Sequence, residues 1–285
     1  MKYYCPSTLS EYFECLNTIG SSQVSILSGG TDLMPRYEQG MPWPENIIDI
    51  KKLAELRGIT EDGGRVAIGA LTSMETLKQS SLIRSHFPAL WMAANDFAGV
   101  QIRNRATLGG NICNASPAGD TLPPLYVYNA KLKLVNNKST RTLPVAEFIT
   151  GPGQVALQPG ELLHSVILPK QSSESVFYKL GLRPAMAIAV VNFALSYRID
   201  SGKLTDMSVA AGAVAPTVVL LDSFSRVLLE DSAALDDAVD QIDKDIAPVS
   251  DIRATADYRR QALKNMLRFY VGHELHKWRE LERRI

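Results

Sequence analysis

Two pairs of adjacent glycines carry the clearest chemical signal in the sequence. Gly29-Gly30 follows a short apolar run and precedes Thr31, and Gly109-Gly110 lies between Thr107 and Asn111. Because glycine permits positive φ and close backbone approach, each pair can form a turn that aims several N–H groups at one anion. Two converging turns would make a cradle for a diphosphate, with hydroxyl and amide side chains adding hydrogen bonds. Each pair alone also fits an ordinary tight turn, so both interpretations stay open.

Other sites for chemistry are not evident in the sequence. No G-x-G-x-x-G opens a helix, and no P-loop lysine motif is present. The histidines are dispersed, and His273 with His276 would supply two metal ligands without a third. We therefore expect no catalytic side chain and no metal site.

Charge and cysteine content limit the class of protein. Lys plus Arg equals Asp plus Glu at 30 each, which argues against a nucleic-acid or anionic-membrane surface. No apolar run is long enough to span a membrane, and Met1 to Pro6 does not begin a signal peptide, so we expect a soluble, cytoplasmic protein. Cys5, Cys15 and Cys113 are too scattered for a disulfide framework or a cluster site. Any iron–sulfur cluster would have to belong to another polypeptide.

The glycine pairs lie among alternating short helices and strands. A capping box of Thr8 with Glu11 predicts the first helix, and a second box of Thr72 with Glu75 predicts a short one. The segment Gln101 to Asp120 has few long apolar side chains and predicts mostly loop. The other predicted elements in this half are strands at 24–27, 47–50 and 65–68 and a helix at 87–97.

The second half predicts antiparallel sheets followed by a helix. Short strands with turns fill 131–168, a polar linker follows at 169–175, and three strands are expected at 176–182, 188–199 and 204–214. The amphipathic tail at 254–284 predicts a surface helix packed on that sheet, in preference to a membrane or partner helix. The expected fold is therefore α+β, with two domains at 1–170 and 175–285.

Both glycine segments resemble the flavin loops of one protein family. Ser28-Gly29-Gly30-Thr31-Asp32-Leu33 is similar to the first flavin loop of xanthine dehydrogenase and carbon monoxide dehydrogenase flavoproteins, and Gln101 to Asp120 is similar to the second. The resemblance also includes 47–56, 212–217 and 253–259 and covers essentially the whole chain. It implies an FAD-binding (medium) subunit of the molybdenum hydroxylase family. The implied fold is a two-subdomain, vanillyl-alcohol-oxidase-like FAD domain before a C-terminal domain of the carbon monoxide dehydrogenase flavoprotein type, with a three-stranded antiparallel sheet and helices.

The resemblance also implies which residues hold FAD. The diphosphate would lie against the backbone of 26–33 and 106–110, and Phe97 would lie against the isoalloxazine, although it also fits a core position. Asp120 is acidic, so it would accept from a cofactor hydroxyl, and it equally fits a helix N-cap. Lys179 would lie near the flavin, although a strand lysine is usually exposed. The full implied set is Ile26, Leu27, Ser28, Gly29, Gly30, Thr31, Asp32, Leu33, Phe97, Ala106, Thr107, Leu108, Gly109, Gly110, Asn111, Asn114, Asp120, Leu163 and Lys179.

The same resemblance implies partners and a direction of electron flow. A molybdopterin-binding large subunit and a small subunit with 2Fe–2S clusters would supply electrons, which leave FAD for NAD+ or another acceptor. Ala187 stands where the family usually has Asp, which puts the electrostatics of the flavin site in doubt. Two other functions stay open: a self-sufficient flavin oxidase, and a redox-silent scaffold subunit.

Overall fold

The computed structural model describes residues 1–20 and 24–276, which form two compact units. Unit 1 comprises Met1–Ser80, Phe97–Ala115 and Asn129–Lys170, and unit 2 comprises Ser81–Asp96, Ser116–Tyr128 and Gln171–Ile285. Each unit is therefore assembled from segments that are separated in the sequence.

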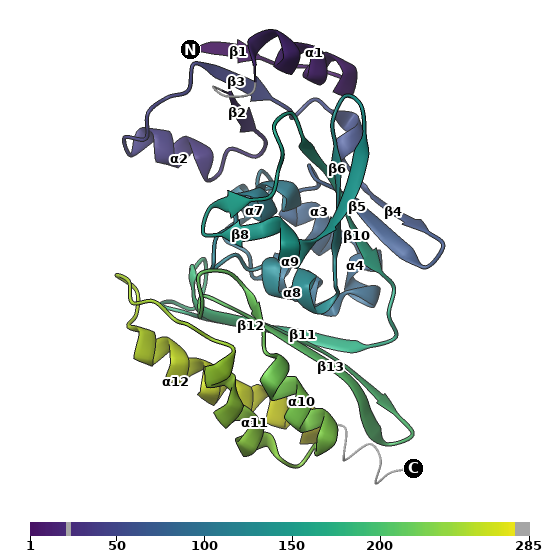
Figure 1. Cartoon of the computed structure of the whole chain (residues 1–285), viewed down its shortest axis with the longest axis vertical. Helices are drawn as coiled ribbons and strands as arrows, with labels where there is room; N and C mark the ends of the chain where they lie inside the picture. Colours follow the sequence, from purple (N-terminus) through teal and green to yellow (C-terminus); the bar gives the residue numbers. More distant parts are fainter. Residues whose placement is uncertain (21–23, 277–285) are drawn as a thin grey trace. The chain divides into compact units, whose positions relative to one another are not determined.

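Unit 1 begins with a small parallel sheet covered by the first helix (Figure 1). Its strands run in the order β1 (Lys2–Tyr4), β3 (Asn46–Asp49), β2 (Val24–Leu27). Helix α1 (Leu9–Ile19) starts where the Thr8 side chain accepts from the Glu11 amide, and it ends at Gly20. Tyr12 and Leu16 of this helix pack into a buried cluster with Ile48 of β3. The predicted helix cap and strands of this region are confirmed.

A five-stranded antiparallel sheet completes unit 1. Its order is β4 (Ile59–Asp62), β5 (Arg65–Gly69), β10 (Leu162–Pro169), β6 (Lys131–Val135), β7 (Thr140–Pro144), and β8 (Ile149–Gly151) pairs separately with β9 (Gln154–Val155). The helices of the unit, apart from α1, are short: α2 (Leu33–Glu38), η1 (Ala54–Leu56), α3 (Met74–Gln79), α6 (Val100–Arg103), α7 (Leu108–Asn114) and α9 (Val145–Phe148).

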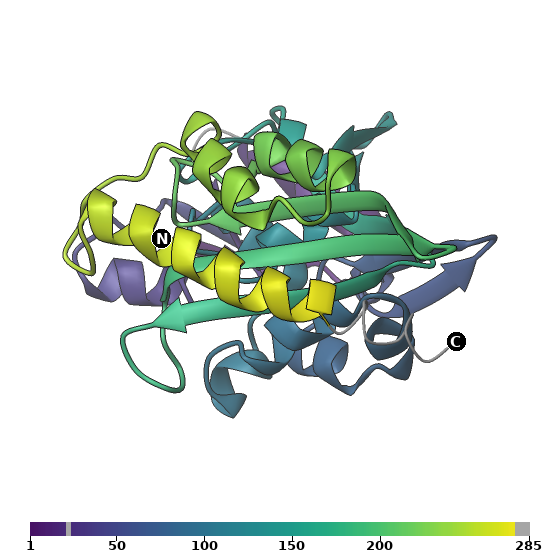
Figure 2. The same cartoon turned by 90° about the horizontal axis from the view of Figure 1, so that it is seen from below.

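Unit 2 contains a second antiparallel sheet with helices on both faces (Figures 1 and 2). The sheet order is β11 (Glu174–Gly181), β12 (Ala189–Asp200), β13 (Lys203–Gly212), β14 (Val219–Leu220). The helices are α4 (Ser81–His86), α5 (Pro88–Asn95), α8 (Leu122–Val127), α10 (Asp222–Glu230), α11 (Leu235–Gln241), η2 (Ile242–Lys244), α12 (Ala256–Met266) and the π-helical η3 (Leu267–Val271). The three predicted long strands are confirmed, and the short β14 extends their sheet.

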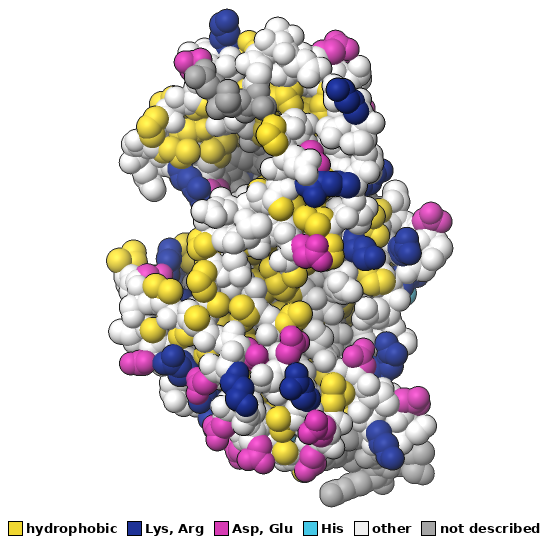
Figure 3. Space-filling model, in the orientation of Figure 1, with side chains coloured by type: hydrophobic (Ala, Val, Ile, Leu, Met, Phe, Trp, Pro, Cys, Tyr) yellow, Lys and Arg dark blue, Asp and Glu magenta, His cyan; other side chains and the backbone are white. Residues whose placement is uncertain are grey.

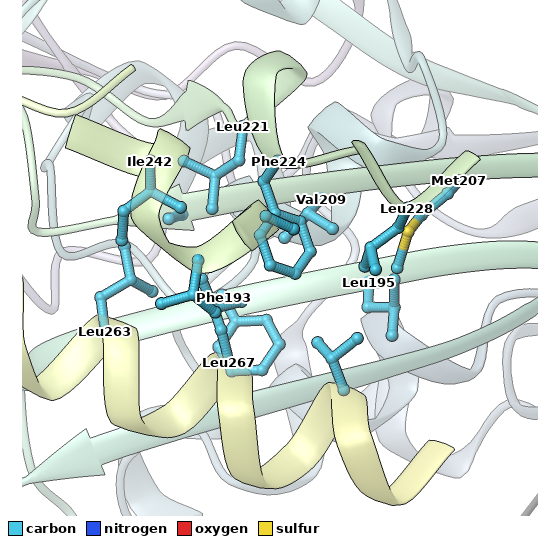
Figure 4. Close-up of a cluster of buried hydrophobic side chains, with 14 of the residues drawn as sticks. Phe193, Leu195, Met207, Val209, Leu221, Phe224, Leu228, Ile242, Leu263 and Leu267 are labelled. Carbon is cyan, nitrogen blue, oxygen red and sulfur yellow. The ribbon is translucent and has the colours of Figure 1, made fainter. Parts of the chain in front are cut away.

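The core of unit 2 explains why β12 is buried along nearly its whole length. Phe193 and Leu195 of β12 face a cluster that includes Phe224 of α10 and Leu263 of α12 (Figure 4). On the other face, α5 and α8 pack against the sheet, so residues on both sides of β12 lose contact with water. A strand covered on both faces carries a continuous run of buried residues instead of an alternating pattern.

The outer surface of the last helices is strongly charged, as expected for a surface helix. Basic and acidic side chains intermingle over α10, α11 and α12 (Figure 3). Lys264 pairs with Asp243 at 2.7 Å and Arg268 pairs with Asp236 at 2.8 Å. The part of the predicted tail after residue 276 lies outside the described residues. No helix within 1–20 and 24–276 is long and apolar enough to cross a membrane.

Two local predictions are wrong. The N-cap of α3 is Ser73, whose side chain accepts from the Thr76 amide, while the Thr72 hydroxyl donates to the Gly58 carbonyl at 3.0 Å. The segment 101–120 is not mostly loop, because it contains part of α6 and all of α7. Helix α7 forms because tertiary hydrogen bonds from its first amides to a neighbouring segment add to its few buried apolar side chains.

Candidate functional site

The first glycine loop connects β2 to α2 in unit 1. The strand ends at the buried Leu27, and Gly30 adopts a φ of 74°, which glycine tolerates without strain. Among the described residues, the backbone amides of Ser28, Gly29, Gly30 and Thr31 donate to no partner. Four consecutive unpaired amides beside a strand end are available to hydrogen-bond an anion.

Most amides of the second glycine loop are already paired, either within the loop or with neighbouring residues of unit 1. Thr107 caps α7 by accepting the Gly110 amide at 3.0 Å. The Leu108 amide donates to the Thr72 carbonyl at 3.0 Å, and the Gly109 amide donates to the Ala70 carbonyl at 2.8 Å. A Cβ on Gly109 would lie 2.7 Å from the Ala70 Cβ. This loop is therefore anchored to its neighbours, and most of the free donors belong to the first loop.

The two loops converge, as the cradle hypothesis expects. A Cβ on Gly29 would collide with the carbonyl of Arg105, so the two backbones touch there. A Cβ on Gly110 would lie 2.8 Å from the Thr107 Oγ1 and 2.9 Å from the Ser28 Oγ. The Thr107 hydroxyl also donates to Ser28 across the junction at 3.4 Å. Position 29 requires glycine because the backbone of Arg105 occupies the place that a Cβ would take.

Arg36 links the two loops, a role that the sequence analysis did not predict. Its guanidinium pairs with Asp32 at 2.7 Å and donates to the Asn114 Oδ1 at 2.7 Å. Asp32 belongs to the first glycine segment and Asn114 to the second. The four-residue spacing of Asp32 and Arg36 on α2 could have indicated the ion pair, but the contact with Asn114 depends on the tertiary fold. Arg36 therefore joins the two segments and neutralises the charge of Asp32.

Unit 2 holds a cluster of charged groups around the buried Lys179 of β11. Its ammonium lies 2.9 Å from the Asp120 Oδ2, 3.1 Å from the Asp96 Oδ2 and 2.8 Å from the Asp96 carbonyl oxygen. The Lys179 side chain is 5% exposed, so the alternative of an ordinary exposed strand lysine is wrong. The other oxygen of Asp120 accepts from the Asn192 amide at 3.0 Å.

Asp120 is held as an acceptor and does not cap a helix. Helix α8 begins after Thr121 and has no side-chain cap, so the capping alternative for Asp120 is wrong. Burial raises the pKa of the Asp120 carboxyl, and the nearby Lys179 and the Asn192 amide partly offset that rise. The carboxylate is thus sensitive to the loss of either donor.

The remaining implied residues lie in unit 1 in different environments. Phe97 is half-buried, and Arg103 donates to its carbonyl at 3.1 Å and to that of Ala98 at 2.9 Å. Ala98 has a positive φ of 39°, so Arg103 fixes a strained turn. Leu163 is 2% exposed within β10. Within the described ranges, no group of three or more His, Cys, Asp or Glu residues is placed to hold a metal ion.

Comparisons with known proteins match both halves of the chain. Residues 1–171 match the family model described as the FAD binding domain in molybdopterin dehydrogenase, and 176–273 match the CO dehydrogenase flavoprotein C-terminal domain. The chain is 34% identical over 280 residues to the xanthine dehydrogenase FAD-binding subunit of Escherichia coli O157:H7, covering 95% of this chain and 94% of that protein. It is 29% identical over 272 residues to the carbon monoxide dehydrogenase medium chain of Hydrogenophaga pseudoflava, with 94% of each chain covered.

A solved structure shows the same similarity in three dimensions. The carbon monoxide dehydrogenase from Hydrogenophaga pseudoflava that lacks the Mo-pyranopterin moiety contains a chain with a TM-score of 0.90 and 28% identity. The match covers 95% of this chain and 96% of that one.

Proposed function

Because the chain belongs to the FAD-binding medium subunits of the molybdenum hydroxylase family, we propose that it transfers electrons between the 2Fe–2S clusters of a partner chain and NAD+ or another acceptor. The observation that carries this proposal is the convergence of the two glycine loops in unit 1, with unpaired amides on the first loop. These features suit the diphosphate of FAD.

The residues of the cradle fit that cofactor chemically. A diphosphate presents several acceptor oxygens and negative charge, and the amides of Ser28 to Thr31 supply donors without a competing partner. The carboxylate of Asp32 would repel phosphate, but Arg36 pairs with it at 2.7 Å. A side chain on Gly29 or Gly110 would collide with the opposite loop or crowd the space beside it. The loops therefore combine close packing, donors and a compensating cation.

We assign the remaining roles by the type of each side chain. Phe97 offers a half-buried ring to the flat isoalloxazine, and Asp120 accepts from a cofactor hydroxyl. Leu163 is assigned to the adenine by its match to the family pattern alone, because its side chain is 2% exposed within β10. When bound, FAD supplies a ring that takes up and releases electrons, and the protein binds, orients and shields it. No acid–base residue is required for that role.

We propose partner chains because this sequence has too few cysteines to bind the 2Fe–2S clusters itself. Two 2Fe–2S clusters are held by about eight thiolates, whereas the sequence contains three cysteines, and all three are free thiols. The relatives are called an FAD-binding subunit and a medium chain, which implies larger assemblies. We propose a large molybdopterin-binding chain and a small iron–sulfur chain as the partners.

A visible absorbance spectrum of the purified chain after incubation with FAD tests this function. We expect about one FAD per chain, and we expect its bleaching by a reduced iron–sulfur partner and its recovery on addition of NAD+ or another acceptor. A chain that takes up no FAD would contradict the proposal and favour a redox-silent scaffold. A chain that oxidises a substrate without partners would establish a self-sufficient flavin oxidase instead.

A further inference from the structure

The described part of unit 2 contains a buried amide that the assigned roles do not explain. Asn192 of β12 is 0% exposed. Its Nδ2 donates to the Asp120 Oδ1 at 3.0 Å, but its Oδ1 has no hydrogen-bond partner among the described residues. An apolar side chain of similar size would avoid burying an unpaired oxygen. The bond to Asp120 is therefore the feature that distinguishes asparagine from leucine at this position.

The sheet register places this amide between two other residues of the same row. Lys179 on β11 lies directly opposite Asn192, and Asn192 lies directly opposite Gly212 on β13. A Cβ on Gly212 would collide with the Asn192 Oδ1, so glycine leaves room for the amide. Two residues of this row therefore donate hydrogen bonds to Asp120, Lys179 from β11 and Asn192 from β12, and Gly212 leaves room for the Asn192 side chain.

Asp120 receives one donor on each carboxylate oxygen. Lys179 bonds Oδ2 at 2.9 Å, and Asn192 bonds Oδ1 at 3.0 Å. A carboxylate can accept about four hydrogen bonds, so each oxygen keeps capacity for one more donor. The Lys179 ammonium has three protons, and three protein oxygens lie within 3.1 Å of it, one from Asp120 and two from Asp96. The carboxylate, and not the ammonium, therefore has hydrogen-bonding capacity to spare.

We infer that Asn192 is a positioning residue that holds Asp120 as an ionised, oriented acceptor for a hydroxyl group of FAD. This inference rests on the proposed function. Without the amide, only Lys179 would favour the charged carboxylate, while burial and the negative charge of Asp96 would oppose it. A protonated or rotated Asp120 would offer the cofactor a weaker acceptor.

The test measures the affinity for FAD as a function of pH, in the wild type and in Asn192→Leu. Fluorescence quenching on titration with FAD gives the affinity at each pH. If ionised Asp120 holds FAD, affinity is full at higher pH and falls as pH drops through the pKa of the folded carboxyl. Loss of the amide removes a bond to the charged form, so the midpoint of this fall moves to higher pH. We also expect affinity to fall about tenfold at neutral pH, the scale of one charge-assisted hydrogen bond.

A matched variant separates positioning from simple destabilisation. Ser196 lies on the same strand, is 5% exposed, and donates to the Ser173 hydroxyl at 3.1 Å. Ser196→Ala should lower the melting temperature without moving the pH midpoint. Asn192→Ser, which shortens the side chain, should move the midpoint in the same direction as Asn192→Leu and provides a second variant should the leucine variant not fold.

The outcomes distinguish the inference from the proposed function. A wild-type chain that binds no FAD at any pH defeats the proposed function itself. A wild-type chain that binds FAD independently of pH, or an Asn192 variant that behaves like Ser196→Ala, overturns the inference alone. An upward midpoint shift confined to the Asn192 variants supports it.

Discussion

At the scale of single residues, the cradle depends on what a Cβ would meet. Gly29 has an ordinary negative φ, so its requirement for glycine comes only from the adjacent Arg105 backbone. Gly30 has a φ of 74°, and a Cβ there would meet only the side chains of Leu27 at 3.2 Å and Met34 at 3.3 Å, so its requirement is mainly conformational. Two neighbouring glycines are thus needed for two different reasons.

We expect Gly29→Ala to separate the two loops and to abolish retention of FAD during purification. The added methyl group meets backbone, which cannot move aside as a flexible side chain can. The FAD-to-protein absorbance ratio measures the effect. Gly151→Ala is the matched control, because its new Cβ would meet only the Gln154 side chain, at 3.0 Å or more. A Gly29→Ala chain with wild-type flavin content would contradict the cradle.

Arg36→Gln should weaken FAD binding about tenfold, since charge-assisted hydrogen bonds contribute about 1.5–3 kcal/mol. The change also removes the cation that compensates Asp32. Its effect on the melting temperature should be small, because about half of each side chain of this ion pair is exposed. Titration of the apoprotein with FAD measures the affinity. Lys170→Gln, which removes an ion pair with Glu61 elsewhere in unit 1, should leave it unchanged.

At the scale of elements, α12 is attached to its sheet by one buried arginine as well as by apolar packing. Arg259 is 4% exposed and donates to the carbonyls of Val190 at 2.6 Å and Ala213 at 3.1 Å. It also bonds Asp251 at 2.7 Å. This side chain therefore connects the start of β12, the residue after β13 and the segment before α12.

We expect Arg259→Met to lower the free energy of unfolding by about 3 kcal/mol, because it leaves buried carbonyl groups without donors. Urea denaturation measures the change. Arg260→Met removes a more exposed arginine of the same helix, which pairs with Asp243 and Asp257, and should lower stability by less than about 1 kcal/mol. An equal fall in the free energy of unfolding for the two variants would show that the buried hydrogen bonds of Arg259 stabilise the fold no more than the exposed ion pairs of Arg260 do.

The contact between Arg259 and Asp251 should also make the stability of the fold depend on pH in the acidic range. Burial alone would raise the pKa of Asp251, but hydrogen bonds from the Arg253 amide and from Arg259 lower it to about 2. A folded-state pKa below the unfolded value stabilises the fold above the unfolded pKa, and this stabilisation disappears as pH falls towards 2. Asp251→Asn should therefore reduce the loss of stability between about pH 4 and 2. Chemical denaturation at several acidic pH values tests this prediction. If the free energy of unfolding of Asp251→Asn falls with pH as steeply as that of the wild type, the prediction is refuted.

At the scale of the whole molecule, the chain should function only within a larger assembly. We expect co-expression with molybdenum and iron–sulfur chains to yield one complex on size-exclusion chromatography, with molybdenum, iron and FAD in the same fractions. Equal numbers of basic and acidic residues argue against long-range steering, so salt should affect the complex little. The chain alone should oxidise neither purines nor aldehydes. A monomer with such activity would refute the assembly.

Much of this protein follows from local sequence. The capping box at Thr8 and Glu11 forms α1 because its hydrogen bonds join residues three apart. The three strands predicted for the second half became β11, β12 and β13, of which β12 carries the nearly continuous run of buried residues that a strand covered on both faces requires. The family and its cofactor were likewise evident from the two glycine segments, which the comparisons confirm.

Only the tertiary structure decided what depends on residues far apart in the chain. Helix α7 was missed because its first amides bond to Ala70 and Thr72, and these partners cannot be identified from local composition. Asp120 is an acceptor and not a helix cap because Lys179 and Asn192, 59 and 72 residues later, reach its carboxylate. The division into discontinuous units also arises from contacts between distant segments. Local hydrogen bonds and apolar periodicity are encoded in neighbouring residues, whereas a buried polar network exists only after the chain has folded around it.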